Sequence, residues 1–124
     1  MINAKKILIV EDELSLQSIL MDELKSEGFN VLVASNGEEG LEIAKKEKPD
    51  LILIDILLPK IDGITMAKEI KKTNSNMLMI FLTNLSDMKH IANATEAVYS
   101  DYIVKSDLNI NDIISKVKEK LGLK

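Results

Sequence analysis

The chain has 124 residues, of which 46% are apolar and 29% charged, and 20 acidic against 16 basic side chains give a formal net charge of −4. This balance is typical of one globular domain with a single core, so we expect one domain over residues 1–124. Cysteine is absent, which excludes disulfides and thiolate metal sites. Arginine is also absent, so the chain lacks the guanidinium group that forms paired hydrogen bonds with guanine in DNA. We therefore expect no direct binding of nucleic acid.

The amino terminus has only four consecutive apolar residues, Ile7-Leu8-Ile9-Val10, before Glu11. This run is too short for the core of a signal peptide or for a membrane span. We therefore expect a cytoplasmic protein with no membrane partner, and interpret the run as a short buried strand.

Short apolar runs alternate with amphipathic segments along the rest of the chain, without repeats or an internal linker. Such alternation is typical of a parallel sheet with helices on both faces. We therefore predict an α/β fold, a flavodoxin-like doubly wound five-stranded parallel sheet in the order 2-1-3-4-5, with five helices. The expected strands are residues 7–10, 31–34, 50–55, 77–82 and 101–104.

The helices are predicted from their caps and their apolar spacing. Asp12 is expected to cap the first helix and Gly28 to end it, and the pair Asn36-Gly37 is expected to open the second. A third helix is expected over about 64–72, and a fourth, the least stable, over 90–98. The apolar positions predicted to face inward on the other helices are Leu16, Ile19, Leu20, Leu24, Ala67, Ile70, Ile113, Ile114, Val117 and Leu121.

Polar residues follow four of the five predicted strands. Glu11 and Asp12 follow the first, Asp55 ends the third, Thr83 follows the fourth and Lys105 follows the fifth. In the predicted order these four strands are neighbours, and ligands of open α/β sheets bind outside the carboxyl ends of the strands. We therefore expect the five side chains to converge.

The chemistry of this set points to a cation and an anion. Three converging carboxylates repel one another unless a cation lies among them or their pKa values shift. Oxygen ligands alone favour Mg²⁺ or Mn²⁺, and Mg²⁺ typically takes one or two carboxylates together with waters and phosphate oxygens. Lys105 could then attract an anion and Thr83 could donate a hydrogen bond to it. We hypothesise that Asp55 is phosphorylated.

These residues, together with Pro59, Asp62-Gly63 and Tyr102, resemble the motifs of the receiver domain of the bacterial response-regulator family, over essentially the whole chain. The resemblance implies a two-component phospho-switch rather than an enzyme, in which a histidine kinase or histidine phosphotransfer protein gives a phosphoryl group to Asp55 with the help of Mg²⁺. It implies Asp55, Thr83 and Lys105 as the reacting set and Thr83 and Tyr102 as switch residues. The metal set that it implies is Glu11, Asp12, Asp55 and Leu57.

The resemblance also implies partners. The face formed by the fourth helix, the fifth strand and the fifth helix would rearrange on phosphorylation and contact a downstream target or output domain, or a second copy of the chain. Leu57 and Leu85 would flank the phosphoryl group, and because both are apolar we expect slow self-dephosphorylation. Ser106 stands where proline is common in the family, so we predict a trans Lys105–Ser106 bond.

Two alternatives stay open at this stage. A pseudo-receiver would bind partners without phosphorylation, and Asn84 and Ser106, which depart from the family pattern, keep that alternative open. An enzyme on the same architecture is disfavoured by the residues after the first strand. A flavodoxin would need a hydroxyl- and glycine-rich loop there, an aspartate-nucleophile phosphatase would need Asp-x-Asp, and a Rossmann protein would need Gly-x-Gly-x-x-Gly.

Overall fold

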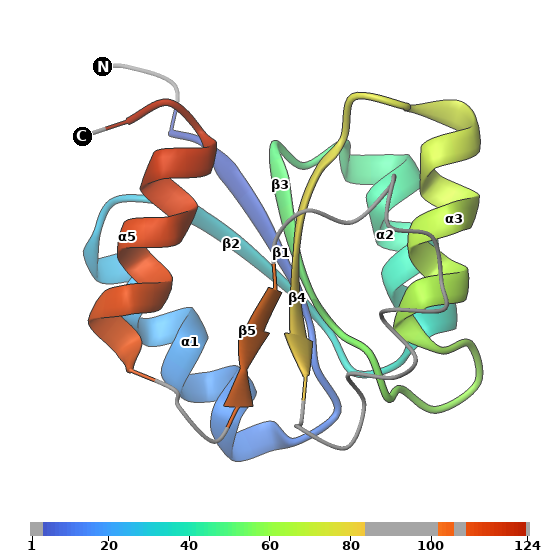
Figure 1. The fold of residues 1–124 in the computed structure, drawn as a ribbon, viewed down its shortest axis with the longest axis horizontal. Coiled ribbons are helices and arrows are strands. Elements are labelled where there is room, and N and C mark those ends of the chain that lie inside the picture. The colour runs from blue at the N-terminus through green and yellow to red at the C-terminus, as the bar shows by residue number, and fades with distance from the viewer. Residues whose placement is uncertain (1–3, 84–101, 106–108, 124) are drawn as a thin grey trace.

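A computed structural model of the chain describes residues 4–83, 102–105 and 109–123. It shows a parallel sheet in the order β2-β1-β3-β4-β5 (Figure 1), which confirms the flavodoxin-like α/β prediction. The fourth predicted helix, residues 90–98, lies outside the described residues, so the full complement of five helices stays a prediction. The strands are β1 (Lys6–Val10), β2 (Asn30–Ala34), β3 (Leu51–Asp55), β4 (Leu78–Thr83) and β5 (Tyr102–Val104), and the described helices are α1 (Leu14–Ser26), α2 (Gly37–Glu47), α3 (Gly63–Thr73) and α5 (Ile110–Lys120).

Helices cover both faces of the sheet, α1 and α5 on one side and α2 and α3 on the other (Figure 1). Successive residues of β1 alternate between the two apolar clusters: Ile7 and Ile9 pack with residues of α1 and α5, and Leu8 and Val10 with residues of α2 and α3. Each of these four side chains is completely buried. The uninterrupted apolar runs of the inner strands therefore follow from burial on both faces.

Three helices begin at residues whose side chains accept a hydrogen bond from the first turn. The Asn36 side chain accepts from the Glu39 N–H at the start of α2, and Asp62 accepts from the Thr65 N–H at the start of α3. Asn109 does the same for α5. These bonds satisfy amide groups that a helix leaves unpaired, and the predicted opening at Asn36 is confirmed.

Helix α1 differs from its prediction in two respects. It begins at Leu14 after Glu13, whose side chain makes no capping bond among the described residues, so the prediction that Asp12 caps this helix is wrong. Asp12 lies one residue too early for that role. Ile19, predicted to face inward, is 49% exposed. Burial in α1 falls mainly on positions four residues apart, Leu16, Leu20 and Leu24, and Ile19 lies off that row.

Gly63 brings the start of α3 against the end of β3. A Cβ atom at this position would lie 2.2 Å from the backbone oxygen of Asp55, closer than any side chain could come. The Gly63 N–H donates to the Ile56 carbonyl at 2.8 Å. The turn after Asp55 is therefore held tightly against its own strand. Within the described part of the chain, no helix has the length and apolar character needed to cross a membrane.

Candidate functional site

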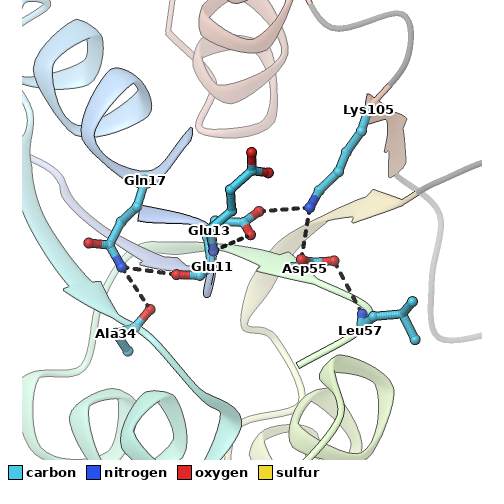
Figure 2. A network of polar contacts seen from close by, with 7 residues as sticks. All are labelled: Glu11, Glu13, Gln17, Ala34, Asp55, Leu57 and Lys105. Atoms are coloured by element: carbon cyan, nitrogen blue, oxygen red, sulfur yellow. Dashed lines mark hydrogen bonds and ion pairs between the residues drawn. The ribbon is translucent and has the colours of Figure 1, made fainter. Parts of the chain in front are cut away.

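Four of the predicted site residues meet at the carboxyl end of the sheet. Carboxylate oxygens of Glu11, Asp12 and Asp55 lie within 4.8 Å of one another. The Lys105 Nζ lies 2.8 Å from Asp55 Oδ2 and 3.1 Å from Glu11 Oε1. Figure 2 shows the Lys105 side chain reaching from the end of β5 to both carboxylates, which come from β3 and the end of β1. The predicted convergence of these residues is therefore seen in the structure.

Thr83 is the last residue of β4 and is completely buried. Its strand lies between the strand of Asp55 and the strand that leads to Lys105. In the register, Leu82 pairs with Asp55 and Thr83 pairs with Val104. Thr83 therefore belongs to the same edge of the sheet. The side chain of Tyr102, the other proposed switch residue, lies outside the described part of the chain. The residues Asn84, Leu85 and Ser106 lie outside it entirely.

Asp55 is fixed at both carboxylate oxygens. Oδ2 accepts a hydrogen bond from the Lys105 ammonium at 2.8 Å, and Oδ1 accepts one from the Leu57 N–H at 3.2 Å. The Asp55 residue is only 5% exposed, whereas Leu57 is 53% exposed. Since an apolar side chain offers no ligand atom, Leu57 could contribute to a metal site only through its backbone carbonyl.

Glu11 is completely buried, and only one of its two carboxylate oxygens accepts a hydrogen bond among the described residues. Its Oε2 accepts from the Glu13 N–H at 3.0 Å, whereas its buried Oε1 has no hydrogen-bond partner among the described residues. The Lys105 Nζ lies 3.1 Å from that Oε1, as a charge contact without hydrogen-bond geometry. Burial raises the pKa of Glu11 to about 7, and the Asp55 charge adds to the rise, against the opposing effects of the Glu13 amide and Lys105.

Lys105 stays positively charged in this setting. Burial by itself would lower its pKa, but the hydrogen bond to Asp55 and the negative charges of Asp55 and Glu11 outweigh the burial and raise the pKa above the ordinary lysine value. The ammonium therefore serves as a resident counter-ion for two buried carboxylates.

The residues fit a hard divalent cation. Three ionised carboxylates and one ammonium would leave a net charge of two negatives, and the donor atoms are all oxygen, the ligand that Mg²⁺ prefers. Asp12 is exposed, which gives an entering ion access from solvent. The buried Oε1 of Glu11 accepts no hydrogen bond among the described residues and contacts only the charge of Lys105, so a nearby cation would stabilise it further.

One residue of this region was missed by the sequence reasoning. Gln17, on α1, is buried, and its Nε2 donates to the Glu11 carbonyl at 3.0 Å and to the Ala34 carbonyl at 3.3 Å (Figure 2). A signal was present in the sequence, since Gln17 is a polar residue between Leu16 and Leu20 on the buried side of a predicted helix. Periodicity alone could not say which groups its amide reaches.

Comparison with known proteins agrees with this geometry. Residues 7–118 match the family model described as the response regulator receiver domain. Over 104 residues the chain is 40% identical to the probable transcriptional regulator ycf27 of Cyanophora paradoxa, a match that covers 84% of this chain and 43% of the relative. The chain thus spans less than half the length of the curated transcriptional regulators of this kind that it matches.

Two further relatives match over nearly their whole length. Sporulation initiation phosphotransferase F of Bacillus subtilis (strain 168) is 33% identical over 120 residues, covering 97% of this chain and 96% of the relative. The crystal structure of the response regulator TrrA from Thermotoga maritima in complex with Mg²⁺-BeF superposes with a TM-score of 0.83 at 34% identity, covering 94% of this chain and 98% of that one. The chain therefore belongs to the response regulator receiver domain family.

Proposed function

We propose that this chain is a phosphoacceptor switch in which a partner phosphohistidine transfers its phosphoryl group to Asp55. The observation that carries the proposal is the position of Asp55: a nearly buried carboxylate, 2.8 Å from the Lys105 ammonium, within a group of acids that fits a divalent cation. The matches to transcriptional regulators and to a sporulation phosphotransferase support a signalling role of this kind.

The transfer follows from the groups at hand. A carboxylate oxygen of Asp55 attacks the phosphorus, an O–P bond forms as the N–P bond breaks, and the histidine, protonated on its other ring nitrogen, leaves as neutral imidazole. Lys105 offsets the charge of the transferred group. Once Asp55 is phosphorylated, the Thr83 hydroxyl donates a hydrogen bond to a phosphoryl oxygen. Mg²⁺, when bound, supplies positive charge that reduces the repulsion between the carboxylates and the incoming phosphate.

The proposed metal ligands are carboxylates of Glu11, Asp12 and Asp55 and the backbone carbonyl of Leu57. Mn²⁺ has the same preference for oxygen and could substitute for Mg²⁺. The proposed donor is a histidine kinase or a histidine phosphotransfer protein. Thr83 and Tyr102 would pass the change to the face formed by residues 90–98, β5 and α5, which would contact a target, an output domain or a second copy.

The test is the intact mass of the purified chain after incubation with acetyl phosphate and Mg²⁺. We expect one added phosphoryl group on the wild type, none on Asp55→Asn, and none when the cation is chelated. Asp50→Asn is the matched control, because Asp50 lies next to the opposite end of β3, and it should retain the adduct. A wild type without an adduct would overturn the proposal and favour the pseudo-receiver alternative.

A further inference from the structure

Gln17 connects the ends of two strands beneath the acidic group. Its buried Nε2 donates to the carbonyls of Glu11 and Ala34 and contacts the Ser35 hydroxyl at 3.3 Å (Figure 2 shows the two carbonyl bonds). Ala34 ends β2, the strand that contributes no residue to the acidic group or to its lysine. The side chain of Gln17 therefore ties the edge strand to the turn that carries two of the three acids.

The bond to Glu11 replaces a strand partner where the sheet ends. Val10 pairs with Ala34 in the register of β1 and β2, and the Glu11 N–H still donates to the Ala34 carbonyl at 3.0 Å. Beyond that point the Glu11 carbonyl accepts from Gln17 at 3.0 Å. Since this carbonyl belongs to the peptide unit between Glu11 and Asp12, and a peptide unit is planar, the bond fixes the backbone from which the Asp12 carboxylate projects.

We propose that Gln17 is a positioning residue for the divalent cation, holding the Glu11–Asp12 peptide so that both carboxylates face Asp55. The inference rests on the proposed function, because it concerns the same cation site. Groups that orient metal ligands commonly cost tenfold or more in metal affinity when they are removed. Gln17→Met keeps the length and approximate volume of the side chain but has no N–H donor, so it isolates the hydrogen bonds.

The matched control is Leu20→Val, a substitution one turn along the same helix at a completely buried position. It should lower the free energy of unfolding without touching the acidic turn. If Gln17 only stabilises the fold, both variants should lose stability and keep their affinity for Mg²⁺. If Gln17 positions the metal ligands, only Gln17→Met should bind Mg²⁺ more weakly.

The experiment is an NMR titration of each chain with Mg²⁺, together with amide hydrogen exchange in the metal-free state. We expect Gln17→Met to weaken Mg²⁺ binding by roughly tenfold and to speed exchange of the Glu13 amide, which donates to Glu11 Oε2. Leu20→Val should keep the wild-type affinity for Mg²⁺ within about twofold. Its Glu13 amide should exchange no faster than the loss of overall stability in that variant explains. If Gln17→Met does not fold, Gln17→Asn gives the same test, because its amide stops one methylene short of the Glu11 carbonyl.

The outcomes separate the two proposals. A wild type that binds Mg²⁺, with a Gln17 variant that binds it equally well, would overturn the positioning role and leave the proposed function standing. A wild type that binds no Mg²⁺ at the acidic group would overturn the proposed function and this inference with it.

Discussion

The two ends of the sheet each hold a lysine bound to acidic or carbonyl oxygens, but they differ in burial. At the amino end, the Lys6 Nζ lies 3.0 Å from the Glu47 carbonyl and 3.5 Å from its carboxylate, with side chains 34% and 37% exposed. At the carboxyl end, the Lys105 side chain is 17% exposed, that of Asp55 is 7% exposed and that of Glu11 is completely buried.

The difference in burial decides how strongly each group of charges depends on its partners. The half-exposed pair at the amino end keeps part of its hydration, and a pair of this kind near the surface contributes little to stability. A buried group of charges loses its hydration and depends on its remaining partners, which is why the pKa of Glu11 rises to about 7. The carboxyl end therefore carries an electrostatic cost that a bound cation could relieve, and the amino end does not.

The largest expected effect on stability comes from replacing Lys105, with replacement of Lys6 as the comparison. Lys105→Met leaves two buried carboxylates without their counter-ion and should lower the free energy of unfolding by roughly 3–5 kcal/mol at pH 8 without Mg²⁺. Lys6→Met should cost less than about 1 kcal/mol. Urea denaturation followed by circular dichroism measures both, and an equal loss in the two variants would refute the comparison.

Glu11→Gln tests the same end of the sheet through its pH dependence. Because the folded-state pKa of about 7 lies above the ordinary 4.5, the folded state holds more protons between these values, so the stability of the wild type should fall as pH rises through that window. The raised pKa of Lys105 acts only at alkaline pH and does not enter. The variant should lack the fall and be more stable than the wild type at pH 8 by about 3 kcal/mol.

The measurement for Glu11→Gln is the free energy of unfolding at a series of pH values between 4 and 8, without divalent cations. Asp50→Asn, at the opposite end of the sheet, is the control and should follow the wild-type curve. A wild type whose stability is flat or rises across this range would show that Glu11 carries no raised pKa.

Leu57→Asn tests the rim of the site and has the smallest expected effect. Leu57 is exposed beside Asp55, so an amide in its place can orient a water toward the phosphoryl group. We expect the phosphorylated chain to lose its phosphoryl group roughly fivefold faster, equivalent to about 1 kcal/mol of barrier. Decay is followed by intact mass after removal of the donor, with the exposed Leu123→Asn as control. An unchanged half-life would remove the role assigned to the apolar side chain.

Much of the fold and of the site could be predicted from local patterns. The apolar run of β3 ends at Asp55 and that of β1 ends before Glu11, and alternation of strands with helices places both ends on one edge of a parallel sheet. Because that edge is set by topology, the meeting of Asp55 with Lys105 and the acidic pair followed without any knowledge of side-chain contacts.

The features that were missed depend on packing between distant segments. The bond from Gln17 to the Glu11 carbonyl requires knowing how α1 sits on the strand ends, and so does the exposure of Ile19. Asp12 was predicted as a helix cap from residue type alone, and the helix begins one residue later than that role needs. The close approach of Gly63 to the Asp55 carbonyl is likewise invisible in a sequence that shows only a turn.

The most direct test of the central claim, that the carboxyl end of the sheet is a cation-dependent phosphoacceptor site, is a crystal structure of the chain with Mg²⁺ and beryllofluoride. We expect the cation about 2.1 Å from carboxylate oxygens of Glu11, Asp12 and Asp55 and from the backbone carbonyl of Leu57, and beryllofluoride on Asp55 within hydrogen-bonding distance of Lys105. An Asp55 carboxylate that still binds only Lys105 and the Leu57 amide, with the ion elsewhere or absent, would contradict it.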